Sequence, residues 1–372
     1  MTAAIEGAKS GLSITLYEKY KIGENIRCAE GFFDTLNLLG EPNYGVKFKI
    51  DEIVVRLNSH FPFPTDNKIN IWMIDRAEWQ RGLADEARAL GVNIVENSPV
   101  DKARFGEIVT RNKWVIDSTG VSSITSLVHG FNRYYTDTSA ISTQYMLEGN
   151  FEDLYGKLKL GVEKHYLGYY WIFPKSLTEA NIGIGFLKKN NLNLWHELDR
   201  ILEKEGISSY RKVKKLGGLC PTMKLDRLTY DNVLLTGDAA GLTSPLHGGG
   251  IDTACISGKI AMQSIVNNSV DSYESELNNI LGQKLQGENE LLEGWHNLTY
   301  PELEDMITII HAANIGLGKL GLLNGKFELL KKIEYLKSTP FLGKYLFNLK
   351  LVRSLPPMVV RWLFPYLAFR LN

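Results

Sequence analysis

The sequence predicts an α/β fold in which a doubly wound parallel sheet is interrupted by an inserted antiparallel sheet and followed by helices. Residues 1–131 alternate between amphipathic helices and short apolar strands. Residues 132–215 change to strand-like runs such as ISTQYMLEG and ANIGIGFL, as in an antiparallel sheet. Residues 216–290 return to a buried strand followed by a helix, and residues 291–372 are mainly helical in pattern. We take these four ranges as the expected domain boundaries.

The first 131 residues supply the alternation of helices and strands. Residues 1–10 place small and apolar side chains at helical spacing, and Gly11 ends this helix before the strand SITLYEK. Residues 45–57 alternate as one strand. Further elements expected here are the strand IWMID, the amphipathic helix RAEWQRGLADEARAL, and the strands VNIVENSPV and KWVIDSTG.

The amino-acid composition limits which partners the protein can bind and in which cellular compartment it is expected. Lys and Arg total 42 and so do Asp and Glu, which leaves no net charge to attract nucleic acid. The three cysteines are too few and too scattered for a disulfide framework or a metal cluster. No stretch reaches the ~18 apolar residues of a membrane-spanning helix, and the N-terminus lacks the apolar region of a signal peptide. We therefore expect a cytoplasmic protein that takes up neither metal nor nucleic acid.

The last 32 residues combine cations and aromatic side chains without any acid, as in VVRWLFPYLAFRLN. This pattern is typical of a segment that lies on an anionic membrane surface. It is equally typical of a terminal helix that packs on the protein body with its cationic side chains extended to water. Both interpretations stay open. The cations are Lys344, Lys350, Arg353, Arg361 and Arg370.

The segment LTGDAAG, followed by PLHGGG, carries the strongest functional signal. A strand that ends in Gly-Asp can direct the carboxylate of Asp238 at a sugar-alcohol hydroxyl. The three glycines permit close approach of backbone to a ligand, and the helix behind them points N–H groups at an electron-rich group. Glu18 ends an earlier strand, where such a fold places an acid for ribose hydroxyls. Together these features predict a dinucleotide cofactor.

Two other features allow a functional and a purely structural interpretation. Tyr169 and Trp171 lie two apart on a strand and share one face, which forms either a wall for an apolar ligand or an ordinary core wall. Cys28 lies beside Arg27 in a glycine-flanked loop, as either a redox or active-site thiol or a small buried hydrophobe.

Three motifs resemble those of the geranylgeranyl reductase family. GDAAGLTSPLHGGGI resembles its second flavin motif, which is shared with the larger group of aromatic hydroxylases and flavin halogenases. IGENIRCAEGF resembles the family's Arg-Cys-Gly/Ala-Glu-Gly motif, and GYYWIFPKSLTEANIGIG resembles its Tyr-x-Trp-x-Phe-Pro motif with the following Gly-x-Gly. The resemblance runs from Met1 to about residue 260. It implies an FAD-binding, Rossmann-like fold of the glutathione-reductase type, with the inserted sheet as the substrate domain.

The resemblance also implies roles for individual residues around FAD. Glu18 would bind the ribose, Arg76 the sugar–phosphate portion and Val100 the adenine through its backbone. Asp238 would hold the ribityl or pyrophosphate region. Cys28, Ala29 and Gly31 would lie along the flavin in a loop that contacts it through the backbone, and Gly250 and Ile251 would give backbone N–H groups to the ring.

For the substrate, the resemblance implies a slot for an isoprenoid chain lined by Tyr169 and Trp171. Gly183 and Gly185 would keep the facing strand low enough for that chain to pass. We expect reduced FAD to deliver hydride to a double bond of a geranylgeranyl chain while a proton reaches the other carbon, with Cys28, Tyr169 or water as the proton source. The catalytic candidates are therefore Cys28, Tyr169 and Trp171.

Several alternatives remain at this stage. The substrate is either an unsaturated ether phospholipid or geranylgeranyl diphosphate or its chlorophyll ester, and the electron donor is NAD(P)H or a ferredoxin-like reductant. A flavin monooxygenase or halogenase of the same fold, or a non-catalytic lipid-binding remnant, are rival functions. Contact with a membrane surface would come from the C-terminal region.

Two departures from the family pattern matter. The family begins with a strand and a Gly-x-Gly-x-x-Gly turn, and this sequence begins about where that turn ends. We expect a misassigned start or a truncated copy. In VIDSTG, Thr119 stands where flavin hydroxylases have the acid of an Asp-Gly motif linked to nicotinamide binding, which makes direct reduction by NADPH less expected.

Overall fold

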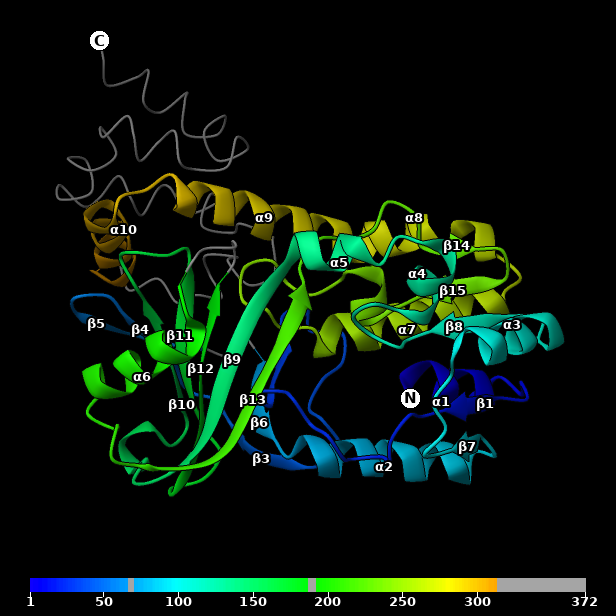
Figure 1. Ribbon diagram of the computed structural model, residues 1–372, viewed down its shortest axis with the longest axis horizontal. Coiled ribbons are helices and arrows are strands. Elements are labelled where there is room, and N and C mark those ends of the chain that lie inside the picture. Colours follow the sequence, from blue (N-terminus) through cyan, green and yellow to red (C-terminus); the bar gives the residue numbers. More distant parts are fainter. Residues whose placement is uncertain (66–69, 187–191, 313–372) are drawn as a thin grey trace, which may run out of the picture.

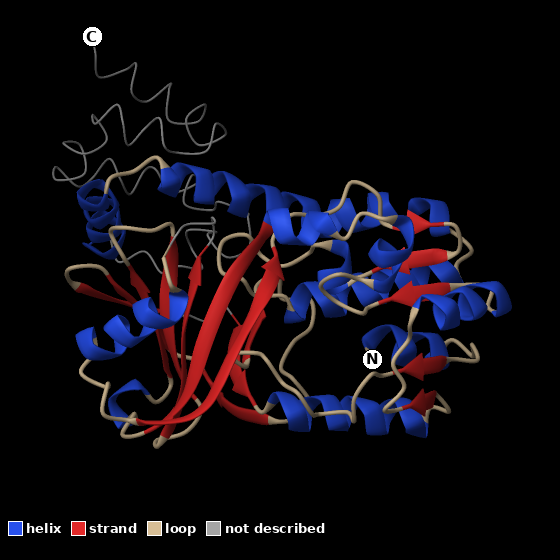
Figure 2. Cartoon of the chain, viewed as in Figure 1, coloured by secondary structure: helices blue, strands red, loops and turns tan. Residues whose placement is uncertain are grey.

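The computed structural model describes residues 1–65, 70–186 and 192–312. A part with one large sheet lies beside a part in which helices enclose short parallel strands (Figure 1). Helix α9 (Gln283–His296) runs along both parts, and α10 (Tyr300–Ala312) follows at the end of the large sheet (Figures 1 and 2).

The α/β part contains two short sheets. β1 (Thr15–Tyr17) pairs in parallel with β7 (Asn93–Val95). β8 (Val115–Asp117) pairs in parallel with β15 (Val233–Leu235), and β14 (Thr229–Tyr230) joins β15 in antiparallel orientation. The helices around these strands are α1 (Thr2–Lys9), α2 (Arg76–Ala89), α3 (Lys102–Arg111), α4 (Ile124–His129), α5 (Arg133–Thr138), α7 (Ile251–Val266) and α8 (Tyr273–Leu277).

Helices α1 and α7 pack closely because glycines face each contact. A Cβ atom on Gly7 would lie 2.8 Å from Sδ of Met262, and one on Gly258 would lie 3.6 Å from Cβ of Ala3. Helix α2 begins with a capping pair, since the Asp75 side chain accepts the N–H of Glu78 at 2.9 Å. The helices expected over residues 1–10 and in RAEWQRGLADEARAL are thus confirmed.

The large sheet has the strand order β13-β9-β12-β11-β10-β4-β5. All neighbouring pairs are antiparallel except β4 with β10, which are parallel. Helix α6 (Leu194–Lys204) covers one face through Leu198, Ile201 and Leu202, which are fully or almost fully buried. The strands are β4 (Glu52–Arg56), β5 (His60–Pro64), β9 (Ser139–Glu148), β10 (Lys157–Val162), β11 (Gly168–Pro174), β12 (Glu179–Phe186) and β13 (Arg211–Pro221).

A three-stranded antiparallel sheet connects the two parts. It consists of β2 (Gly31–Asp34), β6 (Asn70–Ile74) and β3 (Val46–Lys49), in the order β2-β6-β3. Phe32 and Trp72 from this sheet pack with Ile251 at the start of α7. This contact ties the segment after Cys28 to the glycine-preceded helix.

The expectation of one strand over residues 45–57 is wrong, because β3 and β4 belong to different sheets. The chain changes sheet between them. The N–H of Ile50 donates to the carbonyl of Ile71 in β6, whereas the N–H of Asp51 donates to the carbonyl of Gly156 just before β10. Strands β4 and β5 come from within residues 1–131 but extend the large sheet, which is mixed rather than wholly antiparallel.

No helix in the described part of the chain is long and apolar enough to span a membrane. The cationic, aromatic segment at residues 341–372 lies outside the described residues.

Candidate active site

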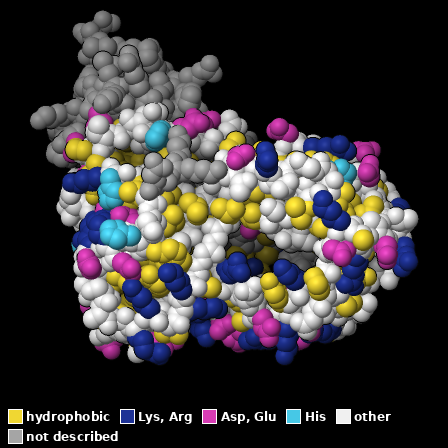
Figure 3. All heavy atoms as spheres, in the orientation of Figure 1, with side chains coloured by type: hydrophobic (Ala, Val, Ile, Leu, Met, Phe, Trp, Pro, Cys, Tyr) yellow, Lys and Arg dark blue, Asp and Glu magenta, His cyan; other side chains and the backbone are white. Residues whose placement is uncertain are grey.

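A cavity of about 1560 Å³ lies between the α/β part and the large sheet. Its opening is visible as a hollow near the middle of the face in Figure 3, with Lys and Arg side chains around it. Strands β1 and β8 both line it, and in the described ranges each has a strand partner on one edge only. The cavity therefore continues from the large sheet to the space beside these two strands.

Every site residue expected from the sequence lines this one cavity. The structure thus brings together side chains that the sequence separates by more than 200 positions, although their individual roles stay predictions. These residues are Glu18, Cys28, Ala29, Gly31, Arg76, Val100, Tyr169, Trp171, Asp238, Gly250 and Ile251.

Glu18 follows β1 and is fixed by local hydrogen bonds. Its N–H donates to the carbonyl of Val95 at 2.9 Å, which continues the pairing of β1 with β7. Its carboxylate accepts the N–H of Tyr20 at 3.0 Å. One carboxylate oxygen remains to accept a hydroxyl of a ligand in the cavity that Glu18 and Val100 both line, and the ribose role stays a prediction.

Arg76, Cys28 and Glu30 form a connected group at the cavity wall. Arg76 Nη1 lies 3.8 Å from the sulfur of Cys28, and its guanidinium lies over the ring of Trp79 at 5.0 Å. Within the described residues its buried Nε has no hydrogen-bond partner. A cation with a free buried donor that faces a cavity fits an anionic ligand group such as a phosphate.

Glu30 is a buried acid that the sequence reasoning missed. It is 4% exposed, accepts the backbone N–H of Arg76 at 3.1 Å and pairs with Lys175 at the end of β11. Its N–H donates to the sulfur of Cys28 at 3.2 Å. Glu30 therefore fixes the Cys28 loop, the start of α2 and the large sheet relative to one another. In the sequence, the only sign of this role is the place of Glu30 in the CAEG motif.

Asp238 and Gly250 meet at the start of α7. The Asp238 carboxylate accepts the hydroxyl of Thr243 at 3.1 Å, and burial raises its pKa. A Cβ atom on Gly250 would lie 3.1 Å from the Asp238 carboxylate, so any larger residue would crowd it. Gly250 provides no side-chain cap for α7, whose first N–H groups remain for a ligand in the cavity.

The large sheet contributes an aromatic wall to the same cavity. Tyr169, Trp171 and Phe173 alternate along β11 and share its cavity face, with ring centroids 5.9 and 6.3 Å apart for the successive pairs. Trp171 Nε1 donates to Asn181 Oδ1 at 2.8 Å, which fixes the indole ring. The wall is thus preorganised to contact an apolar chain.

The expected role of Gly183 needs correction. The indole of Trp171 lies over Gly183, its direct partner on β12, and fills the space that a side chain would take. Gly183 therefore makes room for Trp171 and not for a substrate chain. A Cβ atom on Gly185 would meet only ordinary contacts, 3.7 Å from Trp171 Cζ3, and Gly185 lines the cavity as expected.

His247 of the PLHGGG segment connects the aromatic wall to the glycine loop. Its carbonyl accepts the hydroxyl of Tyr169, and its ring stacks on Phe33 at 5.2 Å. Nδ1 accepts the N–H of Gly249 at 3.2 Å. Burial, aided by the charge of Lys284, lowers the pKa of His247 to about 3, so the ring is neutral.

A buried ion pair lies behind this loop. Lys284 and Glu288, one turn apart on α9, are 1% and 0% exposed, with 2.8 Å between Lys284 Nζ and Glu288 Oε1. The hydroxyl of Ser244 donates to Glu288 at 2.7 Å, and His247 Nε2 lies 3.9 Å from it. The pair therefore anchors α9 to the PLHGGG segment. Its sequence pattern is that of any surface i,i+4 pair, so sequence reasoning could not detect it.

Thr119 has a local structural role. Its hydroxyl donates to Asp117 at 2.6 Å and accepts the N–H of Ile124 at 2.9 Å. Asp117 also accepts two hydrogen bonds from Thr125. These bonds hold the turn from β8 to α4. Position 119 thus carries a structural threonine and no acid that could bind a nicotinamide group.

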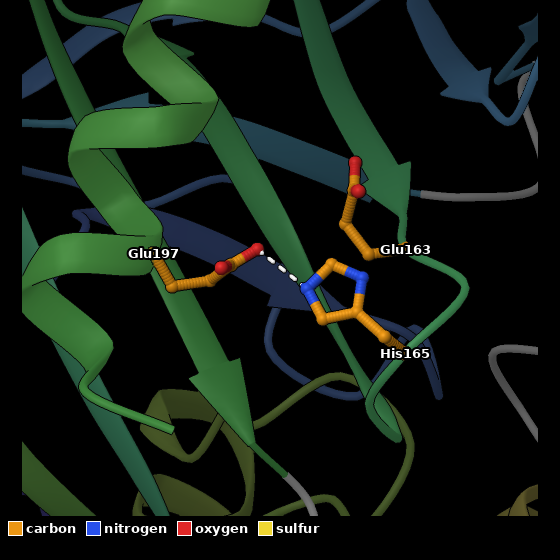
Figure 4. A group of neighbouring side chains, drawn as sticks. All are labelled: Glu163, His165 and Glu197. Carbon is orange, nitrogen blue, oxygen red and sulfur yellow. Dashed lines mark hydrogen bonds and ion pairs between the residues drawn. The ribbon is translucent and has the colours of Figure 1, made fainter.

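A second cluster of polar side chains lies on the far side of the large sheet from the cavity. Glu163, His165 and Glu197 converge there (Figure 4), with 3.0 Å between His165 Nε2 and Glu197. Arg200 and Lys204 already neutralise the two carboxylates, at 2.5–2.7 Å. The cluster is thus an ion-pair network that stabilises α6 on the sheet.

The fold and the cavity define a class of protein. A Gly-Asp strand end, a glycine-preceded helix and a large sheet that closes a shared cavity fit an oxidoreductase that holds a nucleotide-containing cofactor beside an apolar substrate wall. Residues 138–219 match the model of the geranylgeranyl reductase catalytic domain. Over this stretch the chain is similar to the geranylgeranyl reductases, and a flavin is the cofactor that this similarity indicates.

Individual relatives agree with this assignment. Digeranylgeranylglycerophospholipid reductase 2 of Methanococcoides burtonii is 26% identical over 89% of this chain and 90% of the relative. The digeranylgeranylglycerophospholipid reductase of Methanocaldococcus jannaschii is 28% identical over 71% of this chain and 74% of the relative.

Solved structures share the fold. A geranylgeranyl bacteriochlorophyll reductase-like protein of Thermoplasma acidophilum has a TM-score of 0.70 at 22% identity, covering 90% of this chain and 96% of that one. CmlS, a flavin-dependent halogenase, has a TM-score of 0.58 at 16% identity, covering 80% and 62%. The sequence-based fold class is thereby confirmed.

Proposed function

We propose that this protein is an FAD-dependent reductase that saturates carbon–carbon double bonds of geranylgeranyl chains in isoprenoid lipids. The observation that carries the proposal is the single cavity in which the cofactor-type residues and the aromatic wall of β11 meet. The two groups of residues come from different parts of the fold, as a reaction between a cofactor and an apolar chain requires. The names of the relatives and of the matching domain support the same reaction class.

Bound FAD supplies hydride chemistry: a hydride goes to one alkene carbon, a proton goes to the other, and the two electrons come from NAD(P)H or a ferredoxin-like donor. The residues that would hold it are those expected from the sequence. Arg76 offers a guanidinium for the phosphates, and the free N–H groups at the start of α7 would stabilise negative charge on the flavin ring. Glu18 offers a carboxylate oxygen for the ribose.

The aromatic wall serves the substrate. An isolated trisubstituted alkene has no carbonyl to stabilise developing charge, so positive charge on a tertiary carbon must be shielded from water. The faces of Tyr169 and Trp171 supply this shielding and attract positive charge. The hydroxyl of Tyr169 is committed to the carbonyl of His247, and burial raises its pKa, which makes it a poor proton donor. Among the side chains named for the proton step, Cys28 is the better candidate.

The decisive experiment is anaerobic spectroscopy of the purified protein. Visible flavin bands that bleach with a reductant and recover on addition of a geranylgeranyl lipid would establish the reductase. Recovery only with oxygen and an aromatic substrate would point to a monooxygenase or halogenase. A colourless protein that still binds anionic liposomes would point to a non-catalytic lipid-binding remnant. The same liposome assay tests the proposed contact of the C-terminal region with a membrane surface.

A further inference from the structure

The polar atoms of the aromatic wall are already used within the protein. Trp171 Nε1 donates to Asn181, and the hydroxyl of Tyr169 donates to the carbonyl of His247. On the neighbouring strands, the Ser142 hydroxyl donates weakly to the carbonyl of Gly218 at 3.4 Å, and burial raises the pKa of the Cys220 thiol to about 12. These groups are therefore poor hydrogen-bonding partners for a ligand.

Gln144 differs from them. It lies on β9 and is only 5% exposed, yet it lines the cavity. Among the described residues its side-chain amide makes no hydrogen bond, and its amide atoms are accessible from the cavity and not sealed in the sheet. The amide therefore offers a donor and an acceptor to a ligand or to water in the cavity.

The sheet register places this amide next to the aromatic wall. Gln144 pairs with Gly183, and Gly183 pairs with Trp171, so all three lie in one row across β9, β12 and β11. Because Gly183 has no side chain, the Trp171 indole extends over it toward β9. A chain that lies on Trp171 would therefore bring its polar end close to the amide of Gln144.

The charge of this wall limits what that polar end can be. None of the cavity-lining residues that the described strands of the large sheet contribute is charged. The cations around the cavity come from the other side, where the cofactor phosphates are expected. An amide both donates and accepts hydrogen bonds but cannot neutralise an anion. The sheet-derived lining residues are Ile53, Ala140, Ile141, Ser142, Gln144, Leu160, Tyr169, Trp171, Phe173, Gly185, Leu219 and Cys220.

We propose that Gln144 is a specificity-determining residue that hydrogen-bonds an uncharged oxygen, such as an ether or ester oxygen, at the head end of the prenyl chain. This inference rests on the proposed function and adds the chemistry of the substrate's polar end. The bond fixes how far the chain slides along Trp171, and so which double bond reaches the cofactor. An anionic group of the substrate stays outside this section of the cavity.

The test removes the proposed hydrogen bond in two ways, first by replacing the oxygen of the substrate and then by replacing the amide of Gln144. The probes are geranylgeranyl methyl ether and the isosteric hydrocarbon in which CH₂ replaces the oxygen. The kcat/KM for each is measured under anaerobic conditions with the wild-type protein and with Gln144→Leu. We expect Gln144→Leu to lower kcat/KM about tenfold for the ether and less than twofold for the hydrocarbon. Equal losses for both probes would overturn the inference.

The matched control is Thr143→Val, because Thr143 is the neighbour of Gln144 on β9, is 7% exposed and points to the opposite face. It should leave the ratio of the two kcat/KM values unchanged, and a change as large as that of Gln144→Leu would count against the proposal. If the wild-type protein reduces neither probe, the proposed function fails. Binding of the two probes, followed by tryptophan fluorescence, then gives the same comparison without turnover, and equal affinities in wild type and variant would reject the role of Gln144.

Discussion

The indole of Trp171 occupies the side-chain space of Gly183, the residue directly opposite it on the neighbouring strand. The same relationship occurs on the other face of β11, where the ring of Tyr170 lies over Gly161 of β10. Each aromatic ring covers a glycine that would otherwise leave a gap in the sheet. Cross-strand pairs of this kind fix the orientation of the ring as well as the register of the strands.

This relationship predicts the effect of a single methyl group. Gly183→Ala should displace Trp171 from its place over β12, lower the free energy of unfolding by about 1–3 kcal/mol and raise the KM for a prenyl substrate. The control is Gly185→Ala, two residues further on the same face, where the new Cβ would meet only ordinary contacts at 3.7 and 4.0 Å. Urea denaturation compares the two variants. An equal effect of both would show that the Trp171–Gly183 contact is not the cause.

The buried pair on α9 predicts an asymmetric response to mutation. Lys284→Met should lower the free energy of unfolding by about 3–5 kcal/mol, because it leaves Glu288 buried within the field of the Asp252 carboxylate and without a compensating charge. The double variant Lys284→Met/Glu288→Leu should recover most of this loss, since it removes both buried charges. Denaturant titration measures both. A double variant as unstable as the single one would mean that the pair acts through shape and not through charge.

The contacts of Glu30 lead us to expect that a change of this residue lowers both the stability of the protein and its retention of the cofactor. Glu30→Gln keeps the shape of the side chain but weakens its bonds to Lys175 and to the N–H of Arg76. We expect a loss of about 1–3 kcal/mol in the free energy of unfolding, together with a lower flavin content after purification. Glu24→Gln, an exposed change in the same loop, is the control. Full flavin content in Glu30→Gln would show that Glu30 contributes to the stability of the fold but not to retention of the cofactor.

The sequence allowed the fold class and most of the cavity lining to be predicted, because both depend on local signals. Periodicity located α1, α2 and β11, and the resemblance of short motifs located residues such as Asp238 and Arg76. The features that it missed depend on pairing between distant strands. Nothing in the alternation of residues 45–57 shows that the chain changes sheet at Ile50, and the burial of Lys284 is decided by the loop against which α9 packs. The sequence likewise does not show that Gln144 lies in one row with Trp171, because this depends on the register of β9, β12 and β11.

His247 predicts how the stability of the protein depends on pH. Its pKa is lowered to about 3 in the folded state, chiefly by burial, against about 6.5 in the unfolded chain. Between these values the unfolded chain binds a proton at this residue and the folded protein does not. The stability contributed by neutral His247 is therefore present above about pH 6.5 and is lost as the pH falls toward 3, by up to about 1.4 kcal/mol per pH unit.

His247→Gln should remove this part of the pH dependence, whereas His296→Gln, at an exposed position on α9, should leave it in place. Free energies of unfolding measured from pH 7.5 down to about pH 4.5 decide the matter: parallel curves for wild type and His247→Gln would show that the His247 ring becomes accessible to protons within the folded protein.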